Sequence, residues 1–216
     1  MDKTMLVTRP RYDDATEYLF YYASLIIEEA ENKNIKVIDL KRPRLTKEIA
    51  SEIIMEKCPR FLFFNAHGDD DAIYGDKIDG QEEPLIKEGI NHKLLDSKIV
   101  YARACSSAIS LGKSCSNGCF IGYNVLFSFF IDQRWSANPA NDKTAKLFLE
   151  PSNLIAISLV RGFVVKEAVE KSSKMTKKNI LELLKKDSEP GASASAMLLW
   201  NNLEGLEVIG DDSMRI

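Results

Sequence analysis

The sequence is short of several features that mark large classes of proteins. Its 216 residues include only two histidines, and its formal net charge is −3 at pH 7. A chain without an excess of basic residues gives no reason to expect nucleic acid or an anionic membrane as a partner. No apolar run approaches the roughly 18 residues that span a bilayer, and the N-terminal "MDKTMLVTRP" has no signal-peptide pattern. We therefore expect a cytoplasmic protein.

Cysteine is also scarce, which bears on disulfides and metals. Four cysteines occur, at Cys58, Cys105, Cys115 and Cys119. They are too few for a secreted-type disulfide framework in a chain of this length. None is spaced C-x-x-C, and Asn117-Gly118 interrupts the last pair, which argues against a helical zinc site. We expect free thiols and no metal cofactor.

The composition that is present is ordinary for a globular protein, with 45% hydrophobic and 28% charged residues. No linker, repeat or low-complexity tract divides the chain, so we expect a single domain over residues 1–216. Strand-like and helix-like segments alternate along it. This alternation predicts the α/β class, as a three-layer α/β/α sandwich with a mostly parallel central sheet.

Apolar runs mark the expected strands, at 5–8, 35–40, 60–66, 98–105, 119–125 and 206–211. The runs 60–66 and 98–105 are almost continuously apolar, as in central parallel strands buried on both faces. Helices are expected from Asp13 and Asp14, from Thr46 to before Pro59, and at 143–149, 152–161, 165–175, 177–186 and 193–203.

The first helix has a predicted cap and a predicted apolar face. Glu17 stands three positions after Asp14, as in a capping box. The helical period predicts that five residues of this helix face the sheet: Tyr18, Leu19, Tyr22, Leu25 and Ile26.

Two chemically active side chains stand at the ends of the two strongest strands. His67 follows the strand 60–66, and Cys105 ends the strand 98–105. Ligands of parallel sheets bind beyond the carboxyl ends of the strands, and consecutive strands are often neighbours. A histidine close to a thiol can take its proton or stabilise the thiolate. The sequence thus predicts a Cys/His pair at one edge of the sheet.

The residues around this pair suit acyl transfer. The segment "SSAISLGK" after Cys105 is interpreted as the start of a helix, whose dipole would also favour the thiolate. Gly68 has no side chain, so its N–H and that of Cys105 would form a two-donor oxyanion hole. Taken singly, a histidine at a strand end is usually an ordinary loop residue, and a cysteine in a strand is usually a small core residue.

The motifs "FLFFNAHG" and "IVYARAC" resemble the His-Gly and Ala-Cys strand ends of the caspase-like cysteine peptidases, nearest to the gingipain and CHAT types. The similarity continues through "FIGY", "DKTAKLFLEPSN", "VVKEAVEKS" and "LEVIGDDSMRI". The resemblance implies a caspase-like sandwich with His67 as the catalytic histidine, Cys105 as the nucleophile and Gly68 in the oxyanion hole. The chain departs from caspases in a shorter His-to-Cys segment and in Arg103, where caspases have glutamine.

The resemblance implies a cysteine endopeptidase that acts on a protein or peptide through a thioester acyl-enzyme. A regulatory protein partner fits the same family. The main alternative is a catalytically silent caspase-like domain that serves as a protein-binding or signalling module. A receiver-like domain is a more distant alternative, because it needs an acceptor aspartate at the strand end where this chain has His67.

Candidate substrate-binding residues surround the pair. Arg103 shares a strand face with Cys105, so its guanidinium would bind a substrate carboxylate and favour Asp or Glu. The opposite preference, for Lys or Arg, would come from aspartates of the neighbouring loops: Asp69, Asp70, Asp71 and Asp132. Trp135 would cover a bound peptide from a mobile loop at 132–142.

Two other features have plainer expectations. The segment 69–80, "DDDAIYGDKIDG", is expected to be a solvated acidic loop. Calcium binding is the less favoured alternative, since the segment lacks the order of an EF-hand loop. His92, in "INHKLLD", is expected to be a solvated residue without a catalytic role.

Overall fold

A computed structural model describes residues 3–185 and 189–216, and within them six strands form a central sheet in the order β2-β1-β3-β6-β7-β8. The strands are β1 (Thr4–Thr8), β2 (Lys36–Leu40), β3 (Phe61–Asn65), β6 (Ile99–Arg103), β7 (Cys119–Tyr123) and β8 (Leu206–Gly210). Neighbours pair in parallel except β8, which is antiparallel to β7. The predicted α/β class with a mostly parallel sheet is confirmed.

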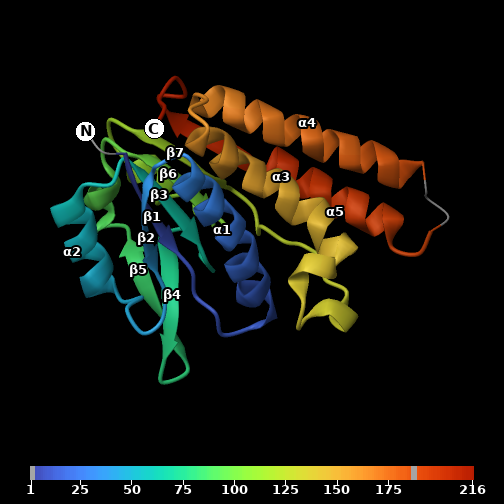
Figure 1. Cartoon of the computed structure of the whole chain (residues 1–216), viewed down its shortest axis with the longest axis horizontal. Helices are drawn as coiled ribbons and strands as arrows, with labels where there is room; N and C mark the ends of the chain where they lie inside the picture. The colour runs from blue at the N-terminus through green and yellow to red at the C-terminus, as the bar shows by residue number, and fades with distance from the viewer. Residues whose placement is uncertain (1–2, 186–188) are drawn as a thin grey trace.

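Helices cover the sheet unequally (Figure 1). One face carries α1 (Asp14–Asn32), α3 (Lys143–Val160), α4 (Val165–Leu184) and α5 (Ala192–Glu204). The other carries α2 (Lys47–Lys57) and a hairpin of β4 (Ala72–Ile78) and β5 (Gln81–Lys87). Short 3₁₀ turns are η1 (His92–Leu95), η2 (Gly112–Ser114), η3 (Gln133–Trp135) and η4 (Pro139–Asn141).

The core lies on both faces of the sheet. In β3, Phe61 and Phe63 pack on the side of α1 and α3, whereas Leu62 and Phe64 pack on the side of α2 and the hairpin. All four side chains are 0% exposed, which explains why this strand is continuously apolar in sequence. Burial on both faces holds the central strands in place and so fixes what lies at their ends.

The predicted start of α1 is right in place but wrong in detail. Asp13, not Asp14, is the N-cap: its backbone is extended, and its side chain accepts a hydrogen bond from the N–H of Thr16. Thr16 completes the capping box, while Glu17 pairs with Arg11 instead. Of the predicted inward face, Tyr18, Leu19, Tyr22 and Ile26 are buried and Leu25 is 37% exposed.

The predicted break at Pro151 is absent, since α3 runs through it. A proline inside a helix leaves the carbonyl of residue i−4 without its partner. Here that carbonyl, of Leu147, accepts a hydrogen bond of 2.9 Å from Nδ2 of Asn179 on α4. A contact from another helix thus replaces the missing bond, which the local sequence could not indicate.

The predicted helices 165–175 and 177–186 are the single helix α4, with residue 186 outside the described residues. Thr176, at the expected break, is buried and its hydroxyl donates to the carbonyl of Ser172. That hydrogen bond satisfies the hydroxyl without interrupting the helix.

The prediction of an acidic loop at 69–80 is also wrong, because most of this segment forms strand β4. The hairpin turns at Asp79 and Gly80, whose φ angles of 51° and 83° are both positive. An Asp-Gly pair with two positive φ angles is the favoured two-residue hairpin turn. The signal was therefore present in the sequence as "DG".

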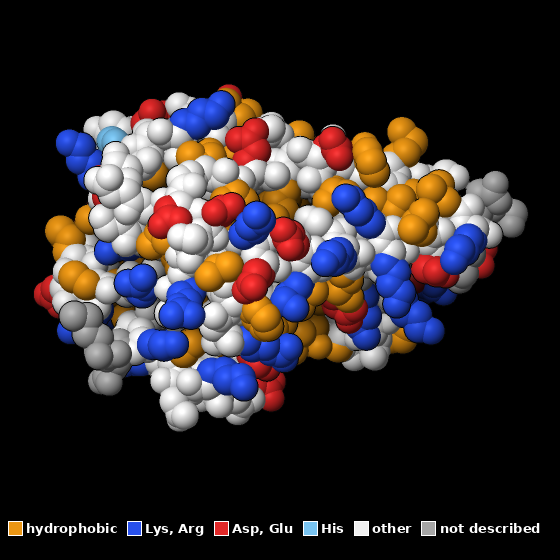
Figure 2. Space-filling view, turned by 90° about the horizontal axis from the view of Figure 1, so that it is seen from above, with side chains coloured by type: hydrophobic (Ala, Val, Ile, Leu, Met, Phe, Trp, Pro, Cys, Tyr) orange, Lys and Arg blue, Asp and Glu red, His pale blue; other side chains and the backbone are white. Residues whose placement is uncertain are grey.

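Hydrophobic side chains lie exposed on the outer surface of α4 and α5, beside charged residues of both signs (Figure 2). They include Leu181, Leu184, Met197 and Trp200. Within the part of the chain that the structure describes, no helix is both long and apolar enough to cross a membrane.

Asp142 connects three segments near the carboxyl ends of the strands. It is 0% exposed, and its Oδ1 caps α3 by accepting from the N–H groups of Thr144 and Ala145. Its Oδ2 accepts from the hydroxyl of Tyr18 on α1 and from the N–H of Asp132. One carboxylate thereby ties α1, α3 and the loop 132–142 together.

Replacing this carboxylate tests its importance. Asp142→Ala removes a helix cap and leaves buried donors without an acceptor, so we expect the free energy of unfolding to fall by roughly 3 kcal/mol. Urea unfolding followed by circular dichroism measures it. The control is Asp211→Ala, which removes an exposed carboxylate that accepts hydrogen bonds from the nearby Ser213, and for which we expect little change. Equal effects of the two substitutions would contradict this role of Asp142.

Candidate active site

The parallel pairing of β3 and β6 brings the two candidate catalytic residues to the same edge of the sheet. In this register Asn65 lies opposite Arg103, and the N–H of Ala66 donates to the carbonyl of Arg103 at 3.3 Å. His67 and Cys105 each follow two residues after that last pair. They therefore leave the sheet at the same edge from adjacent strands, as the sequence predicts.

Gly68 lies against the chain at Cys105. A Cβ at Gly68 would come within 2.9 Å of the Cβ of Ala104 and 3.1 Å of the carbonyl oxygens of Ala72 and Cys105. Real Cβ atoms do not tolerate the first of these distances, so this position requires glycine. The missing side chain is what allows the backbone after His67 to touch the backbone at the nucleophile.

The N–H of Gly68 is not used by the hairpin beside it. The hydrogen bonds run on either side of it, from the N–H of Asp69 to Ala72 and from the N–H of Tyr74 to the carbonyl of His67. Gly68 is thus in the non-hydrogen-bonded position of an antiparallel bridge. At such a position the N–H points away from the partner strand, and here it remains available to a ligand oxygen.

His67 has a partner that sequence reasoning missed. Its Nε2 lies 2.8 Å from Oδ2 of Asp13, the N-cap of α1, and its side chain is 33% exposed. Burial alone raises the pKa of Asp13, but hydrogen bonds from Thr16 and the contact with His67 outweigh it and hold that pKa below its ordinary value. The local sequence indicates Asp13 only as a residue that opens a helix, although it stands close after β1, the strand next to β3.

This contact fixes which ring nitrogen can act as a base. An ionised carboxylate only accepts hydrogen bonds, so in the neutral ring Nε2 carries the proton that Asp13 accepts. Nδ1 then holds the free lone pair. The ring of Tyr12 packs on His67 with centroids 5.9 Å apart, and its hydroxyl donates to Glu82 on β5. Asp13 and Tyr12 together hold the imidazole in one orientation.

Cys105 is partly buried, and its thiol donates a hydrogen bond to the backbone. Its Sγ donates to the carbonyl of Phe127 at 3.7 Å. Burial raises the pKa of the Cys105 thiol, and backbone hydrogen bonds at Phe127 and at Cys105 itself oppose the rise only in part. A raised pKa means that a base must remove the proton before this sulfur can act as a nucleophile.

The helix expected after Cys105 does not form. The chain turns at Ser106, where φ is 54°, and continues through turns to the 3₁₀ helix η2. The N–H groups of Ser106 and Ala108 donate to the carbonyls of Val125 and Tyr123, so packing along the end of β7 replaces helical bonds. The predicted stabilisation of a thiolate by a helix dipole is therefore wrong.

Arg103 is not a surface ligand for a substrate carboxylate, contrary to the prediction. It is 0% exposed, and its guanidinium donates to Asn65, Ser152 and Asn153 inside the core. It does share the α1 side of the sheet with Cys105, as strand alternation predicts. The guanidinium reaches inward between β3 and α3 instead of outward, and the acidic preference that it predicted loses its basis.

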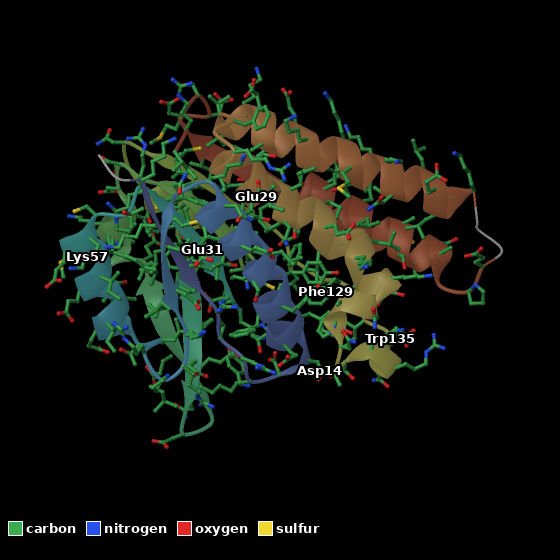
Figure 3. All side chains as sticks on the ribbon, viewed as in Figure 1. Asp14, Glu29, Glu31, Lys57, Phe129 and Trp135 are labelled. Carbon is green, nitrogen blue, oxygen red and sulfur yellow. The ribbon has the colours of Figure 1, made fainter. Side chains whose placement is uncertain are left out.

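The other predicted substrate-binding residues lie near the same edge of the sheet. They differ in whether their side chains already have partners within the protein. Asp69 accepts from the N–H groups of Asp71 and Ala72 and from the hydroxyl of Tyr74, so its oxygens hold the start of the hairpin. Asp132 pairs with Arg134. Trp135 is 39% exposed in η3, and lies with Asp14 and Phe129 at this end of the molecule (Figure 3).

The calcium alternative has no support from the acidic segment. Asp71 pairs with Lys87 and Asp76 with Arg42. Among residues 3–185 and 189–216, no three His, Cys, Asp or Glu side chains lie close enough together to hold a metal ion. His92 lies away from the site in η1, where its Nδ1 accepts from the N–H of Gly89.

Two open clefts flank the site, and α1 forms a wall of each. One, of about 550 Å³, is lined by Arg11, Tyr12, Asp13, Asp14, Glu17, Ser136 and Ala137. The other, of about 320 Å³, is lined by Asp14, Ala15, Phe127, Ser128, Phe129 and Ile131. The lining of the second cleft includes Phe127, whose carbonyl accepts the hydrogen bond from the thiol of Cys105. Sequence reasoning overlooked residues 127–131, because aromatic residues next to a strand resemble ordinary core.

No protein-family model matches the chain, and no curated protein is significantly similar to it.

The raised pKa of Cys105 predicts how the thiol reacts with alkylating agents. Because burial raises its pKa, we expect alkylation of Cys105 by iodoacetamide to be slow at pH 7 and to accelerate continuously up to pH 9 and beyond. Mass spectrometry of the Cys105 peptide measures this, with the exposed Cys58 as an internal reference. A rate already independent of pH at neutrality would instead indicate a resting thiolate.

Proposed function

We propose that this protein is a caspase-like cysteine peptidase, in which Cys105 and His67 cleave peptide bonds through a thioester acyl-enzyme. One observation carries the proposal: the β3–β6 register brings a histidine and a cysteine to one sheet edge, with the backbone of Gly68 packed on Cys105. The oriented imidazole and the adjacent open clefts support it further.

In the first half of the reaction, Nδ1 of His67 takes the thiol proton as Sγ of Cys105 attacks the substrate carbonyl carbon. The carbonyl π electrons move to oxygen, and the N–H groups of Gly68 and Cys105 receive the resulting oxyanion. The oxyanion then re-forms the carbonyl as the C–N bond breaks, and the amine leaves with the proton from His67. The thioester remains on Cys105. Transfer by a positioned base contributes about 10²–10⁴-fold to such a rate, and one oxyanion donor about 10²–10³-fold.

In the second half, water replaces the amine. His67 removes a proton from the water as its oxygen attacks the thioester carbon, and the same N–H groups receive the oxyanion. The C–S bond breaks, the carboxylic acid product leaves and the proton returns to sulfur. Asp13 does not exchange protons; it positions the ring and compensates the charge that His67 gains in each half.

We also propose a cytoplasmic location. The four cysteines all lie within the described residues and carry free thiols, which suits a reducing compartment.

Substitution of the two central residues tests the proposal. Cys105→Ala and His67→Ala each remove a group that moves in the reaction, so we expect both to abolish hydrolysis of a peptide library while far-UV circular dichroism stays unchanged. His92→Ala is the matched histidine control and should retain wild-type activity. Hydrolysis that persists in Cys105→Ala would falsify the mechanism, and a wild type without any hydrolysis would favour a silent binding module.

Asp13 combines a capping role with a positioning role, and two variants separate them. Asp13→Asn keeps a good N-cap but removes the negative charge beside His67. We expect kcat to fall at least about tenfold, because correct orientation of His67 accounts for part of the roughly 10²–10⁴-fold rate acceleration that a positioned base provides. We expect KM and the thermal midpoint to be nearly unchanged.

The matched control is Thr16→Ala, which weakens the capping box but leaves the contact between Asp13 and His67. We expect it to lower the thermal midpoint and to leave kcat unchanged at a temperature where the fold is intact. If kcat falls equally in both variants, Asp13 serves the helix and does not position His67.

A further inference from the structure

An open groove of about 640 Å³ lies between α4 and α5 on the outer surface of the molecule. Ile180 of α4 and Ala196 of α5 lie at its bottom, and both are buried. Leu184, Met197 and Trp200 also line it, and they are 53%, 74% and 52% exposed. When large apolar side chains gather in one exposed place on a soluble protein, they commonly mark a surface that another molecule covers.

The groove has the dimensions of one helix. It follows α5 from Ser193 to Glu204, which at 1.5 Å per residue is about 17 Å, or three helical turns. Its walls are two helices packed side by side (Figure 1). A third helix laid along them inserts its ridge of side chains into the groove, as helices of a bundle do. An extended peptide has no sheet edge to pair with here, since both walls are helical.

The α4 side of the groove is basic. Lys174, Lys177 and Lys178 are exposed, and none of them forms an ion pair within residues 3–185 and 189–216. Lys177 stands three positions before Ile180, so it lies on the same side of the helix as the groove. The helix as a whole has five lysines and three glutamates, although the net charge of the chain is −3. This local excess of positive charge is complementary to an acidic partner.

We propose that the groove between α4 and α5 binds an amphipathic helix of another protein, with apolar residues spaced i, i+3, i+4 and i+7 and with Asp or Glu along one flank. The apolar face of this helix covers Leu184, Met197 and Trp200, and its carboxylates pair with the lysines of α4. The groove shares no residue with the site around Cys105 and His67. The proposal therefore does not depend on peptidase activity.

Two other occupants fit these observations less well. A second copy of this chain brings the same lysines, and its α5 offers Glu204 as its one charged residue to compensate them. A lipid surface can contact the side chains that project from the helices, but it does not fill a groove between them.

The experiment measures the binding of three synthetic helical peptides, each about three turns long. The first has leucines at the proposed spacing and glutamates along one flank, the second has lysines in place of the glutamates, and the third has alanines in place of the leucines. The protein carries Trp135→Phe, so that Trp200 is its one tryptophan. We expect the first peptide to shift the emission of Trp200 to shorter wavelength and to bind at least about tenfold more tightly than the other two.

Two matched pairs of substitutions locate the binding surface. Met197→Glu places a charge among the apolar side chains and should weaken the acidic peptide at least about tenfold. Met55→Glu, at another exposed methionine on α2, should leave its affinity unchanged. Lys177→Glu should weaken the acidic peptide and strengthen the lysine peptide. Lys57→Glu, on α2 at the far side of the molecule from α4 (Figure 3), should do neither.

Four outcomes overturn the proposal. The acidic peptide does not bind at about 1 mM, or it binds with an affinity that Met197→Glu and Lys177→Glu leave unchanged. Vesicles of phosphatidylcholine and phosphatidylserine bind in place of the peptide and lose binding in Met197→Glu, which assigns the groove to a membrane. Sedimentation velocity shows a dimer that excludes the peptide and that Met197→Glu dissociates, which assigns the groove to a second copy of the chain.

Discussion

The backbone ladder between β3 and β6 is the constraint on which the rest of the site depends. Its register places Asn65 opposite Arg103, and both residues are fully buried. A shift of this ladder by one residue would turn every side chain of the strand to the opposite face of the sheet, which two packed cores forbid. The positions of His67 and Cys105 are thus consequences of how the centre of the molecule packs.

The buried side of the same residue pair reinforces the register. The guanidinium of Arg103 donates to Asn65 on β3 and to Ser152 and Asn153 on α3, and Asn153 in turn donates to the carbonyl of Tyr22 on α1. A buried charge is tolerated only with such partners. This network joins the sheet to the helical layer directly beneath the site. It explains why Arg103, which the sequence predicts to bind substrate, instead stabilises the core.

The first turn of α1 is the second determinant of the site. Asp13 both caps the helix and contacts Nε2 of His67, and the neighbouring Asp14 lines the cleft that Phe127 also lines. Helix capping and the orientation of His67 therefore depend on the same residue, Asp13. Asp142 holds the loop 132–142 against α1, because its carboxylate accepts hydrogen bonds from the hydroxyl of Tyr18 and from the N–H of Asp132.

The sequence by itself determined the α/β class, the two central strands that form β3 and β6, and the position of His67 and Cys105 just beyond the ends of these adjacent strands, because these follow from apolar runs and from the geometry of parallel strands. Tertiary structure decided what lies between segments distant in sequence. It supplied Asp13 as the partner of His67, directed Arg103 inward, and continued α3 through Pro151 with a hydrogen bond from Asn179. Each of these contacts spans more than 25 residues, and no local pattern encodes which distant side chain will fill a given hydrogen bond.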